Sequence, residues 1–482
     1  MQVTDRLFIG GEWVAPAGTE TIDVISPHSE ETVGRVPAGT PADMDRAVDA
    51  ARRAFDEGPW SRLALLERAD LLDRLATVYG QRLSDMAQTI TTEMGSPTSF
   101  SQMVQAPMPW MLLQYYVGLG RTSTLEEPRT GVLGDVLVRR EPVGVVAAIV
   151  PWNVPQAVTM QKLAPALLAG CTVVLKPAEE TPLDAVLLAE LVEESGLPAG
   201  VLNVVPAGRE VGEHLVTHAG VDKVSFTGST AAGRRIASLC GERLKRCSLE
   251  LGGKSAAIIL DDADLETAVG ALRFASFMNG GQACVAHSRI LVSRRRHDEV
   301  VDALAEMVRS LRVGDPADPE TEIGPLAAAR QRDRVEGYIR SGCEQGAKAI
   351  VGGGRPAGQD RGWYVEPTMF VNVDNTMRIA REEIFGPVVA VIPFDDEADA
   401  VAIANDSDYG LAGSVYTADI DKGLDIARRV RTGTYAINQY MIDFAAPYGG
   451  FKCSGIGREN GPEGLHAFLE DKSIVVGQGH RP

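Results

Sequence analysis

The stretch from Val143 to Leu251 constrains the fold most, because short apolar runs alternate there with longer runs of helical periodicity. The apolar runs predict strands over residues 143–150, 172–175, 201–205, 223–227 and 246–251. The runs between them predict helices over residues 155–169, 182–195, 209–219 and 229–240. Repeated alternation of this kind predicts a doubly wound parallel sheet, which binds ligands beyond the carboxyl ends of its strands.

A second region, from residue 255 to about 440, alternates in the same way and predicts another α/β domain. Its predicted strands cover residues 255–260, 289–293, 387–393, 412–417 and 434–437. The first 40 residues predict a strand-rich lead-in, with strands over residues 7–9, 13–14 and 21–25. Long apolar faces then predict helices over residues 41–55, 63–83 and 99–117.

Residues 121–140 differ from both regions and resemble an extended hairpin arm. Gly131 and Gly134 mark its turn, and valines alternate along it at positions 132, 136 and 138. A two-stranded arm cannot bury itself, so we expect it to contact a partner subunit. The apolar run 472–477 predicts a further strand, which needs pairing with the arm of its own chain or of a neighbour.

Length and charge limit the classes of function. The 482 residues exceed one simple core, so two or three domains are expected, and the formal charge of −18 argues against a nucleic-acid or anionic-membrane partner. The chain shows neither a leader segment nor an apolar stretch of bilayer length, which predicts a cytoplasmic protein. Six cysteines without a C-x-x-C pair and seven histidines without ligand spacing favour neither a disulfide framework nor a metal site.

One cysteine stands on a loop between two predicted elements. A helix over residues 263–278, capped by Asp262 or Asp264, is expected to end at Gly280 and Gly281, and the strand 289–293 follows. Cys284 lies between them, where reactive groups are often found. Taken alone, an unpaired cysteine is more commonly a small buried apolar residue, so this pattern leaves both interpretations open.

Several polar residues and glycines follow the strands of the first sheet. Gly208, Gly212, Gly228 and Ser229 lie at junctions between strands and helices, where backbone amides and a helix dipole can bind pyrophosphate. Close packing of a helix on the sheet would explain the same glycines. The G-x-G-x-x-A match at 352–357 contains a proline where a helix should begin, so we interpret it as a turn.

Three charged residues near these strand ends suggest chemistry. Lys176 and Glu179 follow the second strand, where a carboxylate would accept both hydroxyls of a ribose and repel a 2′-phosphate. Glu250 ends the last strand, where desolvation would raise its pKa toward that of a general base. An ion pair between Glu250 and Lys254 is the alternative.

With these features assembled, the chain resembles the aldehyde dehydrogenase superfamily, specifically its hydrolytic members that use a nicotinamide cofactor. The resemblance runs nearly end to end and depends on seven motifs in order. They are PWN at 151–153, KPAE at 176–179, FTGST at 226–230, LELGGK at 249–254, GQAC at 281–284, EEIFGP at 382–387 and PYGGFKCSGIGRE at 447–459. Seven ordered motifs are far more specific than any one of them.

The resemblance implies a role for each matching residue. Cys284 would be the nucleophile, Glu250 the base that activates the hydrolytic water, and Asn153 with the Cys284 amide the oxyanion hole, while Lys162 and Glu459 would assist proton movement. The residues implied for the cofactor are Ile149, Val150, Pro151, Trp152, Lys176, Glu179, Gly208, Gly212, Phe226, Gly228, Ser229, Leu251, Glu383 and Phe385. Val154, Ala157, Val158, Gln161 and Val285 would line the substrate tunnel, and their small or aliphatic side chains favour a medium-sized apolar aldehyde, with broad specificity as the alternative.

The implied fold is a Rossmann-like NAD-binding domain of residues 1–120 and 141–251, a catalytic α/β domain of residues 252–455, and an oligomerisation arm and tail of residues 121–140 and 456–482. A homodimer or homotetramer that uses NAD rather than NADP is expected, with aldehyde oxidation through a Cys284 thiohemiacetal and thioester. Two other activities remain open. Acyl transfer to coenzyme A is disfavoured because relatives of that kind tend to lack a glutamate at the position of Glu250, and a thiol esterase would leave the cofactor motifs unused.

Overall fold

The alternating segment forms the predicted parallel sheet, and its strand order reverses in the middle. In the computed structural model, which describes residues 2–132 and 134–476, this sheet has the order β22-β12-β11-β8-β9-β10-β2-β3. The five parallel strands are β8 (Val145–Ile149), β9 (Thr172–Lys176), β10 (Leu202–Val204), β11 (Lys223–Thr227) and β12 (Arg246–Glu250). The antiparallel strands at its edges are β2 (Leu7–Ile9), β3 (Glu12–Val14) and β22 (Gly455–Ile456). The chain moves outward from β8 through β9 to β10 and then returns to the other side of β8, which makes the sheet doubly wound.

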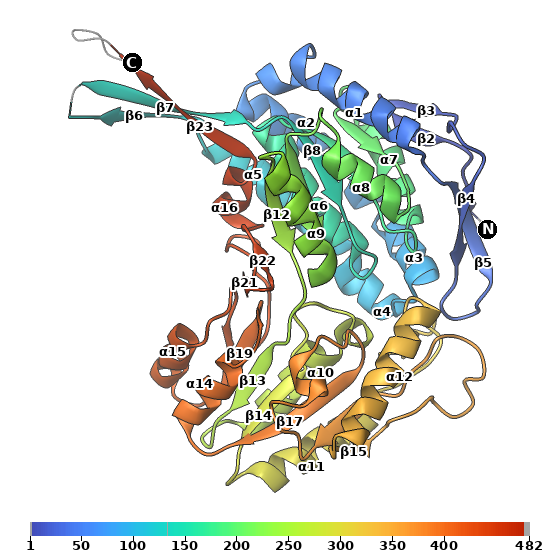
Figure 1. The fold of residues 1–482 in the computed structure, drawn as a ribbon, viewed down its shortest axis with the longest axis vertical. Coiled ribbons are helices and arrows are strands. Elements are labelled where there is room, and N and C mark those ends of the chain that lie inside the picture. The colour runs from blue at the N-terminus through green and yellow to red at the C-terminus, as the bar shows by residue number, and fades with distance from the viewer. Residues whose placement is uncertain (1, 133, 477–482) are drawn as a thin grey trace.

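Helices cover both faces of this sheet, as Figure 1 shows. One face packs against α1 (Pro41–Asp56), α8 (Arg209–Thr217) and α9 (Thr230–Glu242). The other packs against α2 (Leu65–Gln81), α5 (Pro107–Thr122), α6 (Pro155–Ala169) and α7 (Leu183–Ser195). Alternate residues of β8 enter the two cores, Val146 on one side and Val145 on the other, as the twofold period of a strand requires. Every residue of α6 is buried, so polar side chains on it need internal partners.

The second region forms a seven-stranded sheet in the lower half of Figure 1, with the order β15-β16-β17-β14-β13-β19-β20. Its strands are β13 (Ala256–Ile259), β14 (Arg289–Ser293), β15 (Lys348–Val351), β16 (Thr368–Val371), β17 (Val388–Phe394), β19 (Gly413–Tyr416) and β20 (Ala436–Ile437). One face packs against α10 (Leu265–Phe277) and α11 (His297–Arg309). The opposite face packs against α12 (Ala329–Glu344), α13 (Arg378–Arg381), α14 (Glu397–Asn405) and α15 (Ile420–Arg429).

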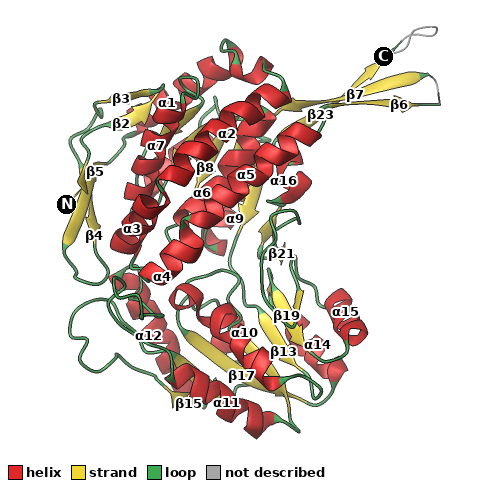
Figure 2. Ribbon diagram, turned by 180° about the vertical axis from the view of Figure 1, so that it is seen from behind, coloured by secondary structure: helices red, strands yellow, loops and turns green. Residues whose placement is uncertain are grey.

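The arm projects from the body as a three-stranded sheet (Figure 2). It consists of β6 (Glu126–Thr130), β7 (Asp135–Pro142) and β23 (Leu469–Val475), with β7 in the middle. The predicted C-terminal strand therefore pairs with the arm of its own chain, although it begins three residues earlier than predicted, and residue 477 lies outside the described part of the chain. A short helix, α16 (Gly461–His466), precedes it.

Two small sheets complete the fold. At the N-terminus β1 (Gln2–Val3), β5 (Thr32–Pro37) and β4 (Thr21–Ile25) form one, and β18 (Tyr409–Gly410) pairs with β21 (Phe451–Lys452) in the other. Across the residues that the structure describes, no helix has both the length and the apolar character needed to cross a bilayer. The same residues contain no group of three or more His, Cys, Asp or Glu side chains that could hold a metal ion.

Several predicted helices have different bounds in the structure. The helix predicted over residues 63–83 ends at Gln81, and α3 (Leu83–Met94) follows at once, because apolar residues continue across the break at Arg82. The helix predicted over residues 99–117 begins instead at Pro107, after a short α4 (Thr98–Phe100) and a wide turn at Ser101–Gln105. The helix before Cys284 stops at Phe277, and the glycines lie beyond its end.

Candidate functional site

The point where the strand order reverses lies at the carboxyl ends of β8 and β11, and two adjoining cavities open there. The first has a volume of about 280 Å³ and the second of about 210 Å³. Pro151 after β8, with Thr227 and Gly228 at the end of β11, lines both of them. Together they form one elongated site at the place where doubly wound sheets bind dinucleotides.

The first cavity contains many of the residues predicted to bind the cofactor. They are Ile149, Val150, Pro151, Lys176, Glu179, Gly212, Phe226 and Gly228. Lys176 Nζ donates to the carbonyl oxygens of Pro177 and Ala207, at 2.7 and 2.8 Å, and burial lowers its pKa to about 8. Gly208 lies beside Glu179, since a Cβ at position 208 would be 3.4 Å from Glu179 Oε1.

Three arginines that were not predicted also line the first cavity. Arg235 on α9 pairs with Glu213, and Arg330 on α12 reaches across from the second α/β region to contact Glu180. Arg209, at the first turn of α8, is the third. This end of the site therefore combines the Glu179 carboxylate with several cations.

The second cavity contains the predicted cofactor residues Trp152, Ser229, Leu251, Glu383 and Phe385. The rings of Trp152 and Phe385 meet edge to face, with centroids 5.4 Å apart. Ser229 caps α9, and its hydroxyl accepts a hydrogen bond from the N–H of Ala232 at 3.3 Å. Hence a helix of 13 residues directs its N-terminus toward both cavities.

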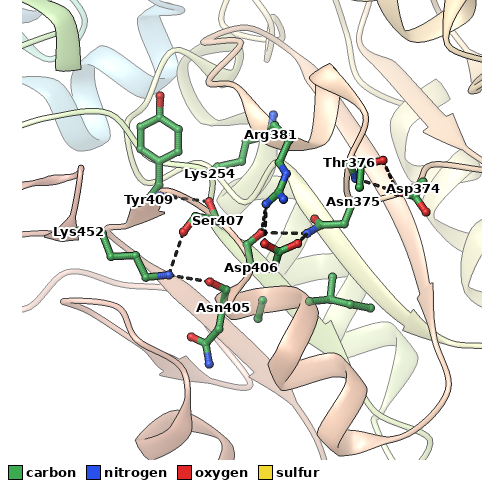
Figure 3. A network of polar contacts seen from close by, with 12 residues as sticks. Lys254, Asp374, Asn375, Thr376, Arg381, Asn405, Asp406, Ser407, Tyr409 and Lys452 are labelled. Atoms are coloured by element: carbon green, nitrogen blue, oxygen red, sulfur yellow. Dashed lines mark hydrogen bonds and ion pairs between the residues drawn. The ribbon is translucent and has the colours of Figure 1, made fainter.

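Glu383 is held by the backbone of the connection between β12 and β13. Its Oε1 accepts a hydrogen bond from the N–H of Gly253 at 3.0 Å, and burial raises its pKa to about 7. A polar network anchors the segment before it (Figure 3): Arg381 Nη1 donates to the carbonyl oxygen of Asp406 at 2.6 Å, and Asn375 Nδ2 donates to the same residue at 2.9 Å. The network ties this segment to the loop after α14 and so limits the movement of Glu383.

Cys284 follows a tight loop between α10 and β14. Asp264 caps α10, accepting a hydrogen bond from the N–H of Thr267 at 2.8 Å, and the backbone is left-handed at Asn279, Gly280 and Gly281. At Gly281 a Cβ would lie 2.2 Å from the carbonyl oxygen of Gly386, so no other residue fits. The loop thus brings the partly buried Cys284 to the wall of the second cavity.

Asn153 connects the two regions at this cavity. Its Nδ2 donates to the carbonyl oxygen of Gln282 at 2.9 Å, and its own carbonyl oxygen accepts hydrogen bonds from Asn279 Nδ2 at 2.8 Å and Gln105 Nε2 at 3.1 Å. A side-chain amide has two hydrogens, so one of them remains to donate into the cavity. The backbone N–H of Cys284 itself favours the thiolate, since it lowers the pKa of the thiol.

The surroundings of the Cys284 sulfur set its protonation. Burial raises the pKa of the thiol to about 12, and the carboxylates of Glu383 and Glu250 act in the same direction. The hydroxyl of Tyr448, 3.3 Å from Sγ, opposes them. The free thiol therefore needs a base or a hydrogen-bond donor before it can act as a thiolate.

Glu250 is buried at the end of β12, and neither of its carboxylate oxygens has a hydrogen-bond partner among the described residues. Burial, with a smaller contribution from Glu459, raises its pKa well above the usual range. The alternative ion pair with Lys254 is wrong, because Lys254 Nζ is likewise without a partner in the described chain. A Cβ at Gly449 would approach Glu250 Oε1 to 2.8 Å, so a glycine leaves space beside the carboxylate.

Lys162 and Glu459 form a buried ion pair behind these residues. Lys162 Nζ on α6 lies 2.6 Å from Glu459 Oε1 and donates to Thr227 Oγ1 at 2.6 Å. The pair joins the first sheet to the C-terminal segment that also carries Tyr448.

The residues predicted for the substrate tunnel separate into two groups. Val154 and Val158 line the second cavity with Cys284. Ala157, Gln161 and Val285 are buried and are not among its lining residues, and Gln161 Nε2 donates to Asn460 Oδ1 at 3.3 Å.

The sequence reasoning missed several residues of the site. Tyr448 stands in a motif that was recognised, yet its contact with Cys284 was not foreseen, and Gln282 likewise belongs to GQAC. Gln331 and Arg334 line the second cavity from α12, which carries no motif, so the sequence offered no signal for them.

Comparison with known proteins identifies the family. The model of the aldehyde dehydrogenase family matches residues 13–474. The chain is 49% identical to geranial dehydrogenase of Castellaniella defragrans and 45% identical to 3-succinoylsemialdehyde-pyridine dehydrogenase of a Pseudomonas species, each match covering at least 98% of both chains.

Comparison with solved structures leads to the same family. An aldehyde dehydrogenase of Mycobacterium tuberculosis in complex with NAD+ superposes with a TM-score of 0.99 at 50% identity over 100% of both chains. A mutant of aldehyde dehydrogenase C from Pseudomonas syringae, in complex with NAD+ and octanal, gives 0.95 at 41% identity and covers 98% of this chain and 96% of its own. The resemblance and the fold class are confirmed, and this chain belongs to the aldehyde dehydrogenase family.

Proposed function

We propose that this protein oxidises an aldehyde to its carboxylic acid with NAD+, using Cys284 as the nucleophile. One observation carries the proposal: the Cys284 sulfur and the Asn153 amide share a cavity that adjoins a second cavity at the strand-order reversal. Glu250, buried and without a hydrogen-bond partner in the described part of the chain, lies close enough to raise the pKa of the Cys284 thiol.

The residues of the chain divide the chemistry between them. The Cys284 thiolate attacks the carbonyl carbon, and the Asn153 amide and the Cys284 N–H donate to the oxyanion of the thiohemiacetal, each such donor contributing roughly 3 kcal/mol. Bound NAD+ supplies a hydride acceptor, after which a thioester remains on Cys284. Glu250 then removes a proton from the water that attacks the thioester, which releases the acid and frees the sulfur.

The two cavities fit a dinucleotide. Gly212 leaves space where a Cβ would lie 3.2 Å from Lys176 Cδ, and the α9 N-terminus at Ser229 suits a pyrophosphate. Lys176 and Glu179 would hold the adenosine ribose and Glu383 the nicotinamide ribose, with Phe385 near the ring. We accordingly assign residues 1–120 and 141–251 to NAD binding, 252–455 to catalysis, and 121–140 with 456–482 to the arm and tail.

We assign proton movement to Lys162 and Glu459. Their contact at 2.6 Å lies behind Glu250, whose pKa both residues shift. A proton released during hydrolysis therefore has a buried acceptor pair beside the base.

The substrate we propose is a medium-sized apolar aldehyde. Val154 and Val158 give the wall beside Cys284 an aliphatic surface, and the related proteins include a geranial dehydrogenase and a structure that holds octanal. Ala157, Gln161 and Val285 would shape the tunnel behind this wall.

Formation of NADH by the purified protein, measured with a panel of aldehydes ranked by kcat/KM, tests the activity. The proposal expects apolar aldehydes of medium length to rank first without coenzyme A. A strict requirement for coenzyme A would favour acyl transfer, and ester hydrolysis without any NADH would favour the esterase. Equal kcat/KM across short, charged and apolar aldehydes would contradict the substrate assignment alone.

We also propose a homodimer or homotetramer assembled through the arm. Its edges are exposed, and Val132 and Val475 present apolar side chains that are 102% and 74% exposed. Sedimentation of the full chain should give a dimer or tetramer, and Val475→Lys should weaken it. A monomer at micromolar concentration would contradict the assembly. The cytoplasmic location stays a prediction that fractionation of producing cells would test.

A further inference from the structure

Tyr448 lies outside the helices and strands, but both its backbone and its ring are held in place. Its N–H donates to the carbonyl oxygen of Glu459 and its carbonyl oxygen accepts from the N–H of Glu459, both at 2.7 Å. The ring is buried in the apolar cluster that surrounds β13 and β14, where Tyr440 and Val285 also lie. Because backbone and ring are both held, the hydroxyl stays at its position 3.3 Å from Cys284 Sγ.

The direction of the hydrogen bond follows from the surroundings of the two groups. Burial raises the pKa of Tyr448 well above the usual range, and neighbouring Cys284 and Glu250 act in the same direction, so the phenol keeps its proton. A buried thiol that loses its proton becomes an anion in an apolar wall and needs a donor. Tyr448 therefore donates, and the sulfur accepts.

We propose that Tyr448 is a catalytic residue, whose hydroxyl donates a hydrogen bond to the Cys284 sulfur and stabilises the thiolate that attacks the aldehyde. The inference rests on the proposed function, because it assigns Tyr448 a task in the step that Cys284 begins. The thiol proton leaves to solvent, and the phenol proton stays on its oxygen throughout.

This role differs from that of the oxyanion donors. Asn153 and the Cys284 N–H act on the former carbonyl oxygen, whereas Tyr448 acts on the sulfur. Once the sulfur is part of a thioester it carries no charge and accepts only weakly, so the Tyr448 contact favours attack more than hydrolysis. A hydrogen bond to an anion corresponds to about 10- to 100-fold in the thiolate population at neutral pH.

The chain offers a matched control in Tyr440. It is a buried tyrosine of the same apolar cluster, its ring meets His287 edge to face with centroids 4.6 Å apart, and it makes no hydrogen bond to the sulfur within the described structure. Tyr440→Phe removes a buried hydroxyl near the site without removing a donor to Cys284.

The test is the rate at which iodoacetamide alkylates Cys284 in the full-length protein, followed by peptide mass spectrometry from neutral to alkaline pH without aldehyde or NAD+. We expect Tyr448→Phe to lower the alkylation rate about 10- to 100-fold across this pH range, because the thiolate population falls by that factor at every pH below the pKa of the thiol. Tyr440→Phe should follow the unmodified protein. An unchanged profile for Tyr448→Phe, or an equal loss in Tyr440→Phe, would overturn the role.

This measurement is independent of turnover. If the unmodified protein formed no NADH with any aldehyde while Tyr448→Phe still shifted the alkylation profile, the proposed function would fail and the hydrogen bond would stand. If NADH formed normally and the profile did not shift, only the role of Tyr448 would fail. Equal far-ultraviolet circular dichroism of both variants excludes misfolding as the cause of a lower rate.

Discussion

Asn153 Nδ2 donates a hydrogen bond to the carbonyl oxygen of Gln282 at 2.9 Å, and this contact ties the loop after β8 to the loop that carries Cys284. The two residues belong to different α/β regions. The donor proposed for the oxyanion and the nucleophile are therefore positioned by the same hydrogen bond.

Removing the Asn153 side-chain amide should lower turnover much more than it lowers the reactivity of the Cys284 thiol. We expect Asn153→Ala to lower kcat by about 100- to 1,000-fold, since one donor to the oxyanion is lost. Alkylation of Cys284 should change much less, because the sulfur keeps its contact with Tyr448. Steady-state NADH formation and alkylation rates measure the two effects. A kcat close to that of the unmodified protein would contradict the oxyanion role of Asn153.

Glu250→Gln should retain hydride transfer but slow hydrolysis of the thioester. Because burial raises the pKa of Glu250, its carboxylate form, and with it the steady-state rate, should increase as pH rises through that raised value. The variant keeps the shape of the side chain but has no base, so we expect one rapid burst of NADH per site and then turnover at least about 100-fold slower. Stopped-flow fluorescence measures both phases. Undiminished turnover, or no burst, would refute the assignment.

The sequence predicted those parts of the fold that depend on local pattern. Helix 155–169 and strands 223–227 and 289–293 have the predicted bounds. Pro155 and Gly170 mark the ends of the helix, Gly228 follows the first strand, and polar residues flank the apolar run of the second. The edge pair β15 and β16 was missed, since its strands have four residues each and β15 is partly exposed. No local signal marks pairs like these.

In the site, too, residues marked by local motifs were predicted, whereas a contact between distant parts of the chain was not. Motifs marked Cys284, Glu250 and Glu383 in the sequence, and Cys284 and Glu383 lie together on the wall of the second cavity, while Glu250 ends β12. The contact between Tyr448 and Cys284 joins positions 164 residues apart through a bridge with Glu459. Such a contact is set by tertiary packing, which periodicity does not encode.

Replacing Lys162 should lower both the stability of the fold and the rate of turnover. A second substitution, at Glu459, tells the two effects apart. Lys162→Met leaves Glu459 buried without a partner, and we expect it to lower the free energy of unfolding by about 3–5 kcal/mol. Adding Glu459→Met removes the unpaired charge and should restore most of the stability, measured by urea denaturation, without restoring turnover. Full recovery of turnover in the double variant would exclude a role in proton movement.

A buried carboxyl pair should make stability depend on pH. Glu93 accepts hydrogen bonds from the N–H groups of Leu183 and Asp184, and burial raises the pKa of Asp184 to about 7 and that of Glu93 well above its usual range. The unfolded chain releases these protons at lower pH than the folded chain does. The free energy of unfolding should therefore fall as pH rises from about 4 to 7, by up to about 1.4 kcal/mol per pH unit and proton.

Glu93→Gln removes one of these carboxyl groups, so the fall in unfolding free energy with pH should become less steep by up to about 1.4 kcal/mol per pH unit over this range. Urea denaturation at several pH values measures it. Glu67→Gln, which changes an exposed carboxylate that caps α2, is the control and should keep the slope. An unchanged slope in Glu93→Gln would show that the buried pair does not hold the proton.

Cofactor choice should depend on one carboxylate among several cations. Glu179 lies in the first cavity with Lys176, Arg209 and Arg235, so its charge repels a 2′-phosphate that the cations would otherwise attract. We expect Glu179→Ser to lower the ratio of kcat/KM for NAD+ to that for NADP+ at least about tenfold, equivalent to about 1.4 kcal/mol. Glu180→Ser is the matched control, because Glu180 lines the same cavity but is paired with Arg330. Equal use of both cofactors by the unmodified protein would contradict a selective role for Glu179. An equal shift in both variants would show that net charge in the cavity, and not the position of Glu179, determines the choice.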